Sequence, residues 1–281
     1  MSKVLSEERS EDFNDLWGEG AKHYYVHGKD NIPFHTIILP SLLLVNGNNW
    51  NLPDEIISSE YLTLEGRKIS TSKNWAIWVK DMVNRYNPDS IRYFLITNGP
   101  EKRYTDFSWR EYVNSHNSEL LGAYGNLVNR SLVFISKYFN GKVPNGKLDE
   151  EIKVSINTLY KTVGEKIEEG LFKDGLDEIF EFIRGSNKYF DKEKPWETRN
   201  TDIKKCSNTL YNCVQIIANL SILLNPFLPF SSEKIQKWLC LNNKWQEQYV
   251  NESFSIPETK ILFDRIDKKV IDEEVERLKG I

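Results

Sequence analysis

Asn126 and Arg130 are two polar residues, four positions apart, whose side chains could read the edges of unpaired nucleic-acid bases. The amide offers donors and an acceptor, and the guanidinium offers several N–H donors in one plane. Trp196 follows a proline in a charged segment, where its ring can remain exposed for a base to stack on. The plainer alternative, which residue types alone favour, is a solvated helix face and a half-buried tryptophan.

An amphipathic helix must position the first two residues. At about 100° per residue, one broad apolar arc collects Leu120, Leu121, Tyr124, Leu127, Val128, Leu132, Ile135 and Phe139. This arc predicts a face that packs into a core. Asn126 and Arg130 then lie one above the other on the opposite face of the helix.

Helical periodicity continues through the rest of the C-terminal part. Apolar residues recur at helical spacing over 152–167, 176–190 and 203–224. We expect Ser231 to cap a shorter helix, and Asn87, followed by a proline, to cap a helix farther upstream. The tail combines an extended apolar piece at 261–263 with an amphipathic helix at 270–278. These segments predict a bundle of about five helices with a tail that packs back on it.

A short α/β pattern precedes the helices. The segment His23–His27 predicts a buried strand that ends at Gly28, and the chain then turns into a helix with Asp30 or Asn31 as its cap. A strand, a glycine, an acidic residue and a helix N-terminus form the usual nucleotide crevice of α/β folds. A second strand is expected over 56–64. The sequence therefore predicts a mainly α fold with a small α/β part.

The composition limits the class of protein. The 281 residues carry a formal net charge of −4, and no apolar run approaches the roughly 20 residues of a membrane span. The N-terminal segment, MSKVLSEERSEDF, is too charged for a signal peptide. The three cysteines form no Cys-x-x-Cys pair, which predicts that the chain holds no zinc. These features predict a cytoplasmic protein in which Cys206 and Cys213 are core thiols.

Local charge differs from the net charge. No acidic residue occurs between Glu119 and Asp149, an interval that holds Arg130, Lys137, Lys142 and Lys147. Four further cations surround the Pro-Trp segment: Lys188, Lys192, Lys194 and Arg199. Two basic neighbourhoods on an acidic protein would guide a phosphate backbone to one face. Ordinary solvated surface is the commoner explanation for such charges, and the sequence leaves it open.

Four segments of the chain, in order, resemble the C-terminal half of the methionyl-tRNA synthetases, which are class I aminoacyl-tRNA synthetases. They are HGKDNIPFH (27–35), EGRKISTSK (65–73), NLVNRSLVFISKYFNG (126–141) and YFDKEKPW (189–196). The resemblance implies that the chain binds methionine tRNA by recognising its CAU anticodon. That role would fall on Asn126, Arg130, Asp191, Pro195 and Trp196.

The same resemblance implies roles for residues in the first part of the chain. Gly28 and Asp30 would hold the ribose of ATP, and His35 would lie beside the methionine pocket. The segment Lys68-Ile-Ser-Thr-Ser72 resembles the class I signature loop, usually Lys-Met/Phe-Ser-Lys-Ser, so Lys68, Ser70, Thr71 and Ser72 would be its functional positions. Thr71 stands where the family has a lysine that supports the triphosphate. A hydroxyl cannot supply that charge, and losing such a donor typically costs about two to three orders of magnitude in rate.

The resemblance also implies three domains. A partial class I catalytic domain, with a Rossmann-type half, the signature loop and a stem-contact region, would occupy 1–116. An anticodon-binding helical bundle would occupy 117–256, and a tail helix at 257–281 would pack back on the body. The other half of the catalytic fold, with its His-Ile-Gly-His type motif, is not found in the sequence.

We therefore expect a protein that binds methionine tRNA but does not form methionyl-adenylate alone. ATP and Mg²⁺ would bind only if another polypeptide supplied the missing N-terminal half. One alternative is the C-terminal subunit of a split methionine–tRNA ligase, which Gly28, Asp30 and His35 favour and Thr71 disfavours. The other is a non-catalytic helical interaction module. Neither DNA nor a membrane is expected as a partner.

Overall fold

The computed structural model describes residues 15–18, 20–47 and 50–279. The charged N-terminal segment on which the argument against a signal peptide depends lies outside these residues. The chain divides into two compact units. The first comprises Met1–Thr63 and Gly99–Asp106, and the second comprises Leu64–Asn98 and Phe107–Ile281.

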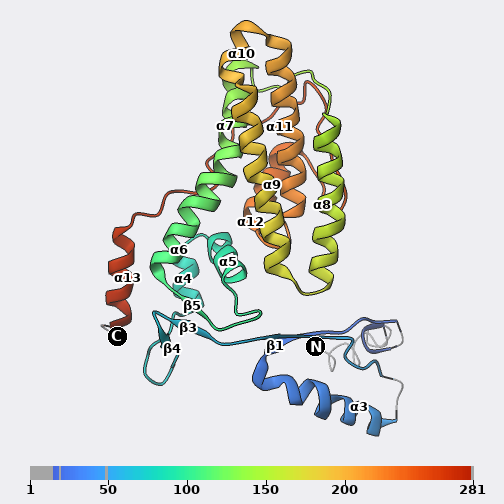
Figure 1. The fold of residues 1–281 in the computed structure, drawn as a ribbon, viewed down its shortest axis with the longest axis vertical. Helices are drawn as coiled ribbons and strands as arrows, with labels where there is room; N and C mark the ends of the chain where they lie inside the picture. Colours follow the sequence, from blue (N-terminus) through green and yellow to red (C-terminus); the bar gives the residue numbers. More distant parts are fainter. Residues whose placement is uncertain (1–14, 19, 48–49, 280–281) are drawn as a thin grey trace. The chain divides into compact units, whose positions relative to one another are not determined.

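The first unit contains a βαβ arrangement of the Rossmann type. Strand β1 (Tyr24–Gly28) pairs in parallel with β2 (Glu55–Ser59). The connection between them holds two short helical turns, η1 (Lys29–Asn31) and η2 (Phe34–Ile38), and helix α3 (Leu39–Asn46), which Figure 1 shows in blue. A parallel pair needs such a crossover, and the helical pattern of the sequence supplies it.

Two details predicted for this unit are wrong. The first strand is not buried, because Tyr24 and Val26 are 37% and 64% exposed and the described residues of the unit put no second layer over them. The helical turns η1 and η2 that follow β1 have no side-chain cap, so the prediction that Asp30 or Asn31 caps this helix is wrong. The carboxylate of Asp30 instead accepts a hydrogen bond from the hydroxyl of Tyr61, which lies far away in sequence and was invisible to a local pattern.

The strand predicted over 56–64 is two strands. After β2 the chain bends at Glu60, whose N–H donates to the carbonyl of Pro100 at 2.7 Å. It then forms β3 (Leu62–Leu64), which lies between β4 (Arg67–Lys68) and β5 (Thr105–Phe107). The turn from β3 to β4 places Gly66 at a φ of 72°, a left-handed conformation that favours glycine.

The second unit begins with four helical segments. They are α4 (Val79–Arg85), α5 (Pro88–Thr97), α6 (Trp109–Ser115) and the π-helical η3 (His116–Gly125), which continues into α7 (Asn126–Tyr138). The predicted cap of α5 is confirmed, since the Asn87 carbonyl oxygen accepts from the N–H of Asp89 at 2.8 Å. The apolar arc is confirmed too: six of its residues are buried, and Leu121 and Phe139 are half-buried.

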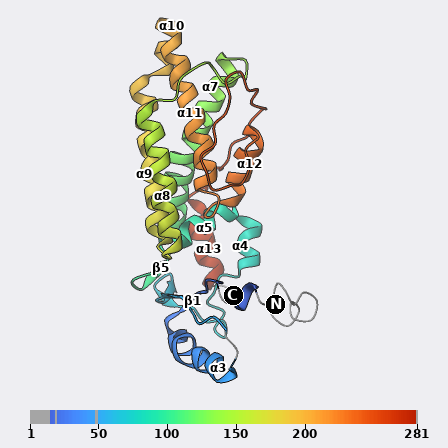
Figure 2. The same cartoon turned by 90° about the vertical axis from the view of Figure 1, so that its right-hand side faces the viewer.

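The predicted bundle is present. Helices α8 (Glu150–Glu168), α9 (Phe172–Glu193) and α11 (Ile203–Leu223) lie side by side, and α10 (Pro195–Thr201) and α12 (Pro229–Leu239) pack against α11 (Figures 1 and 2). Helix α11 is the centre of the core, because most of its residues are buried. The fold is therefore mainly α, with a partial Rossmann-type part and a helical bundle.

The C-terminal helix α13 (Lys269–Lys279) packs against α6. Its buried Glu274 accepts hydrogen bonds from Arg85 at 3.0 Å and from the Tyr86 hydroxyl at 2.7 Å. Upstream of α13, Asn117 exchanges two hydrogen bonds with the backbone of Ile266, at 2.9 and 3.0 Å. The tail is thus attached to the rest of the second unit at two places. The boundaries at 116 and 256 stay a prediction.

Helix α12 is capped from another element, and the prediction that Ser231 caps it is wrong. The helix begins after Leu228 with no cap from its own segment. The fully buried carboxylate of Asp89, at the start of α5, accepts from the N–H groups of Phe230 at 3.2 Å and Ser231 at 2.6 Å. Arg92, one turn later, donates to the carbonyl of Phe227 at 2.7 Å. Helix α5 therefore fixes the turn between α11 and α12.

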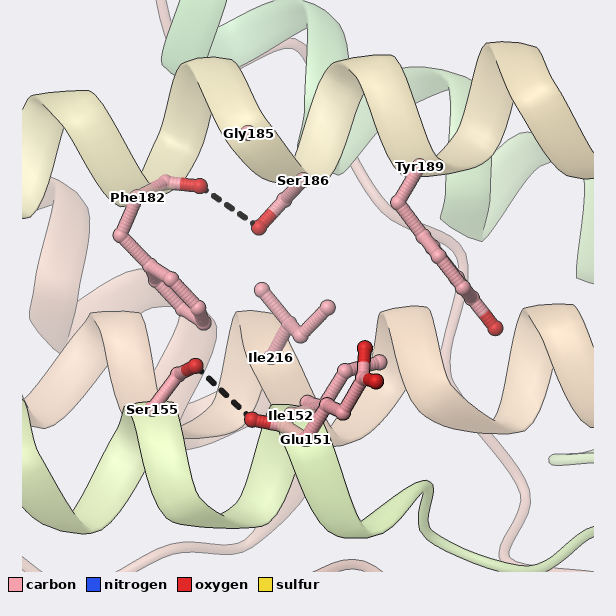
Figure 3. Close-up of a pocket in the computed structure, with 8 residues that line it drawn as sticks. All are labelled: Glu151, Ile152, Ser155, Phe182, Gly185, Ser186, Tyr189 and Ile216. Atoms are coloured by element: carbon pink, nitrogen blue, oxygen red, sulfur yellow. Dashed lines mark hydrogen bonds between the residues drawn. The ribbon is translucent and has the colours of Figure 1, made fainter.

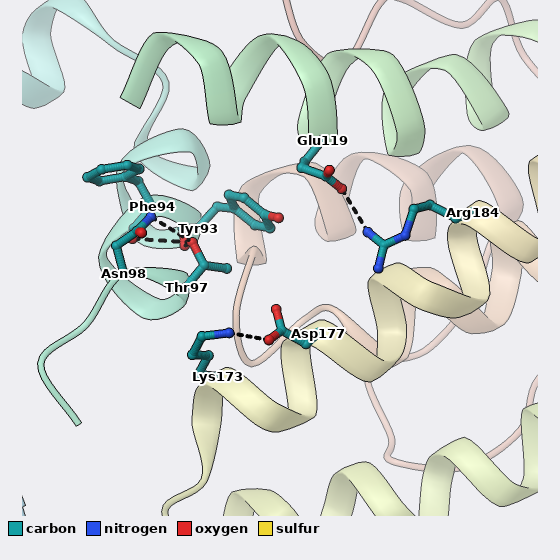
Figure 4. Close-up of polar contacts among 8 residues, drawn as sticks. All are labelled: Tyr93, Phe94, Thr97, Asn98, Glu119, Lys173, Asp177 and Arg184. Carbon is teal, nitrogen blue, oxygen red and sulfur yellow. Dashed lines mark hydrogen bonds and ion pairs between the residues drawn. The ribbon is translucent and has the colours of Figure 1, made fainter. Parts of the chain in front are cut away.

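The other side of α5 contacts the bundle through Tyr93. Its ring lies 4.7 Å from the ring of Phe180. Figure 4 shows the phenol directed toward Glu119, which pairs with Arg184 at 2.9 Å and so joins η3 to α9. Burial, and then the negative charge of Glu119 and Asp177, raise the pKa of Tyr93. The packed ring of Tyr93 therefore joins α5 to α9, beside an ion pair that joins η3 to the same helix.

Two of the three cysteines lie in the core, as the sequence predicted. Cys206 and Cys213 are buried, which confirms them as core thiols, and Cys240 is exposed. Burial raises the pKa of Cys213 to about 12, so this thiol stays protonated and unreactive. Among the described residues, no group of three His, Cys, Asp or Glu side chains could hold a metal ion. No described helix is long and apolar enough to cross a membrane.

A shallow cavity of about 240 Å³ lies between α8, α9 and α11, and Gly185 forms part of its wall (Figure 3). A Cβ added at Gly185 would meet nothing within 4 Å. Because glycine inside a helix costs about 0.5–1 kcal/mol relative to alanine, Gly185→Ala should raise the free energy of unfolding by that amount. Urea unfolding followed by circular dichroism measures it.

Gly146→Ala is the matched control. A Cβ at position 146 would lie 2.5 Å from the Cβ of Tyr211. The Tyr211 Cβ is attached directly to the backbone of α11, so it cannot easily move away. This variant should lose stability. Equal effects of the two substitutions would show that the space around Gly185 is not open.

Candidate functional site

Helix α7 presents Asn126 and Arg130 on the side away from its apolar arc. Asn126 is exposed, and Arg130 is half-buried because its side chain lies across the end of α9. The Cζ atom of Arg130 is 3.7 Å from the centroid of the Phe190 ring, and one terminal nitrogen is 2.6 Å from the Asp191 carboxylate. The predicted pair is therefore accessible, and the guanidinium is held in one plane by a ring and an acid.

The end of α9 brings Trp196 to the same place. Lys194 adopts a left-handed conformation, with a φ of 47°, which ends α9 and lets Pro195 begin α10 in its first turn. The rings of Phe190 and Trp196 are stacked, with centroids 6.1 Å apart and an angle of 29° between the planes. Trp196 keeps 43% of its surface exposed. A guanidinium, a phenyl ring and an indole thus lie in sequence across three helices.

We call this surface the Arg130–Trp196 face and define it by the residues Asn126, Arg130, Asn187, Phe190, Asp191 and Trp196. Pro195 lies outside it, because its ring is buried and its carbonyl accepts a hydrogen bond from the Cys206 thiol at 3.5 Å. The contribution of Pro195 is to hold the start of α10, and with it the position of Trp196.

Two members of the face were not predicted from the sequence as site residues. Asn187 accepts a hydrogen bond from the Asn126 amide at 3.4 Å and donates to the carbonyl of Ala123 at 3.1 Å. It precedes Asp191 by four residues, a spacing that places both on one side of α9 and could have revealed it. Phe190 was assigned only to the apolar side of its helix, although it supports both Arg130 and Trp196.

The ion pair between Arg130 and Asp191 is open to solvent. The side chain of Asp191 is 60% exposed, and that of Arg130 is 21% exposed. An exposed pair contributes at most about 1 kcal/mol, so a ligand can replace it at little cost. The pair orients the guanidinium without removing its capacity to donate to a base or a phosphate.

The predicted signature loop forms a tight hairpin in the second unit. Ser70 and Trp75 exchange two backbone hydrogen bonds of 2.9 Å each, and the hydroxyl oxygens of Ser70 and Ser72 lie 3.2 Å apart. The carbonyl of Thr71 accepts from the N–H of Asn74 at 3.0 Å. Lys68, Thr71 and Ser72 are exposed. The exposed groups of the hairpin therefore include two lysines, Lys68 and Lys73, and the hydroxyls of Thr71 and Ser72.

The predicted nucleotide residues lie in the first unit, at the carboxyl end of β1. Gly28 has no atom within 4 Å of the position its Cβ would take, so the backbone there is open to close approach. The ring of His35 stacks on that of His27 with centroids 4.5 Å apart, and its Nδ1 lies 3.0 Å from the carbonyl of Asn31. Asp30, whose carboxylate accepts a hydrogen bond from the Tyr61 hydroxyl, lies two residues after Gly28 in η1.

Two family models match the chain. Residues 1–132 match the model described as tRNA synthetases class I (M), and residues 149–281 match the anticodon-binding domain of tRNA ligase. Among curated proteins, methionine–tRNA ligase 1 of Alkaliphilus oremlandii is 56% identical over 280 residues, which are 99% of this chain and 52% of that protein. Methionine–tRNA ligase of Bacillus cereus (strain 03BB102) is 55% identical and is covered over 51% of its length.

A solved structure, Mycobacterium tuberculosis methionyl-tRNA synthetase in complex with methionyl-adenylate, superposes with a TM-score of 0.83 and 25% sequence identity. The match covers 92% of this chain and 52% of that one. The chain thus spans about half the length of the relatives it matches.

Proposed function

Because the chain belongs to the class I aminoacyl-tRNA synthetases, as a homologue of the methionyl-tRNA synthetases with an anticodon-binding domain, we propose that it binds methionine tRNA through the CAU anticodon. The Arg130–Trp196 face would receive the anticodon loop. The observation that supports the proposal most is the layered order of Arg130, Phe190 and Trp196, with Asn126 beside them. This order brings together, from three helices, a stacking ring and two base-edge readers.

The proposed role of each residue in the Arg130–Trp196 face follows from the chemistry of its side chain. The exposed ring of Trp196, supported from below by Phe190, offers a flat surface for an unstacked base. Arg130 and Asn126 offer donors and an acceptor to base edges, in orientations that Asp191 and Asn187 set. Pro195 holds the backbone that carries the indole. Each residue named from the sequence therefore keeps a role, Pro195 an indirect one.

We further propose that residues 1–281 alone do not form methionyl-adenylate. The exposed hairpin presents Lys68, but Thr71 adds a hydroxyl where a second cation would stabilise charge that develops on the triphosphate. The open backbone at Gly28 and the carboxylate of Asp30 fit a ribose. ATP with Mg²⁺ would bind productively only when another polypeptide completes the nucleotide site.

One specific observation favours the second candidate, in which the chain works as one part of a methionine–tRNA ligase. Helix α3 buries none of its residues, and its Leu42, Leu44 and Val45 are 64%, 67% and 86% exposed. Apolar surface of this extent is typical of a face that another polypeptide covers. An interaction module without RNA binding is the third candidate, and the tRNA measurement below separates it from the other two.

The test is the affinity of the purified chain for methionine tRNA and for the same tRNA with one changed anticodon base. A lost base contact costs about 1–3 kcal/mol, so the changed tRNA should bind about five- to 150-fold more weakly. Equal affinity at moderate salt would refute recognition of the anticodon.

Methionine-dependent exchange of pyrophosphate into ATP tests the catalytic proposal on the same preparation. The chain alone should give no exchange above a blank without methionine. Measurable exchange would show that Thr71 and the surrounding loop suffice for adenylate formation.

A further inference from the structure

Two cations meet at one exposed tyrosine at the end of α7. The Cζ atom of Arg199, on α10, lies 4.1 Å from the centroid of the Tyr138 ring, and the Lys137 ammonium lies 5.3 Å from it. Tyr138 is 40% exposed. The Nε atom of Arg199 is buried and has no hydrogen-bond acceptor in the part of the chain that the structure describes. An arginine fork that stacks on a ring and retains unused donors is well suited to an anion.

We propose that Lys137, Tyr138 and Arg199 form a binding site for a backbone phosphate of the anticodon loop, distinct from the residues that read its bases. The proposal rests on the proposed function, because it takes the ligand of the Arg130–Trp196 face to be an RNA loop. None of the three residues was a candidate site residue from the sequence, although Lys137 and Arg199 belonged to its two basic neighbourhoods.

The placement of the site along the two helices supports this assignment. On α7, Tyr138 follows Arg130 by two steps of four residues, about 12 Å along the helix axis at 1.5 Å per residue. On α10, Arg199 follows Trp196 by three residues and is its neighbour on the helix surface. Helices α7 and α10 therefore each carry residues of both the Arg130–Trp196 face and the proposed phosphate site, and Figure 1 shows where the two helices lie in the bundle. A strand whose base stacks on Trp196 would carry its backbone past Tyr138 and Arg199.

Charge pairing distinguishes these cations from some of their neighbours. Lys188 and Lys192 also pair with no described carboxylate, but Arg130 pairs with Asp191, Lys194 with Glu197 and Lys205 with Glu193. No described carboxylate lies within 4.0 Å of a nitrogen of Lys137 or Arg199, in contrast. The interaction of its hydroxyl with Arg199, and then with Lys137, lowers the pKa of Tyr138, as expected of a phenol in an uncompensated positive field.

The experiment measures the affinity of the full chain for an isolated anticodon stem-loop RNA with CAU, and for one with a changed anticodon, over a salt series. Arg199→Gln should weaken both by the same factor, about three- to tenfold. It should also reduce the slope of log K against log salt by about 0.7–1, the value for one lost phosphate contact. Lys161→Gln is the matched control, because Lys161 is an exposed lysine on α8 that pairs with no described carboxylate.

Variants of Tyr138 test its part in the site. Tyr138→Phe keeps the ring under the guanidinium and should bind like the unchanged chain, whereas Tyr138→Ala should weaken binding as Arg199→Gln does. Thermal unfolding of each variant shows that the fold is kept. If Arg199→Gln binds like Lys161→Gln, the phosphate site is refuted.

The two proposals fail differently. A chain that prefers CAU but is unaffected by Arg199→Gln keeps the proposed function and loses the phosphate site. A chain that binds both loops equally, yet weakens with Arg199→Gln, loses anticodon recognition and keeps a phosphate contact.

Discussion

Arg130→Ala is expected to weaken binding of methionine tRNA by about 1–3 kcal/mol and to remove most of the preference for CAU. The guanidinium lies against the Phe190 ring, and under the proposed function it would also contact a base, so its loss would remove a contact and a support together. The freed carboxylate of Asp191 is 60% exposed, so water solvates it and the fold is kept. The ratio of affinities for the two anticodons, measured with and without the substitution, gives the effect.

Arg184→Ala is the matched control for this prediction. Arg184 is also an arginine on the bundle surface, with an exposed ion pair to Glu119 at 2.9 Å, but it lies outside the Arg130–Trp196 face. Its removal should leave the preference for CAU unchanged. The assignment of Arg130 fails if both variants lose the same affinity, since a general loss of positive charge would then explain both.

Asp89→Ala is expected to produce the largest loss of stability, about 2–4 kcal/mol in the free energy of unfolding. Its buried carboxylate is the acceptor for two N–H groups at the start of α12, and alanine would leave both without a partner. Asp89→Asn should lower the free energy of unfolding by less, because the side-chain oxygen of asparagine still accepts one of these hydrogen bonds. Urea unfolding followed by circular dichroism measures the three proteins side by side.

Asp202→Ala is the comparison that isolates burial. Asp202 also caps a helix, accepting from the N–H of Lys205 at 3.0 Å at the start of α11, but it is exposed. Water replaces its bond when it is removed, so the loss should be about 1 kcal/mol. Equal losses for the two aspartates would contradict the assignment of Asp89 as the joint between α5 and α12.

The parts of the fold that the sequence predicted correctly are those set by neighbours along the chain. The apolar arc of α7 and the Asn87 cap of α5 depend on residues within a few positions, so spacing and residue type suffice. The cap of α12 was assigned wrongly to Ser231 because its true acceptor, Asp89, lies 142 positions away. The burial of β1 was predicted wrongly because burial depends on the layers that cover a strand, which periodicity does not report.

In the candidate site, too, the sequence predicted what depends on residues close in the chain and missed what depends on distant contacts. The spacing of Asn126 and Arg130 predicted a shared accessible face, and the structure places Trp196 on the same surface. The stacking of Phe190 between Arg130 and Trp196 was not predicted, because it depends on the left-handed turn at Lys194 that redirects the chain into α10. The site roles themselves stay proposals until RNA binding is measured.

Photocrosslinking tests the central claim most directly, because it reports which residues the anticodon touches. An anticodon stem-loop with 4-thiouridine in place of the uridine of CAU is bound to the chain and irradiated, and the crosslinked peptide is mapped by mass spectrometry. We predict that the crosslink falls on the segment with Phe190 and Trp196, or on α7 around Arg130, and that a changed anticodon reduces it. A crosslink confined to α8 or to residues 24–46, with affinity for CAU retained, would contradict the account.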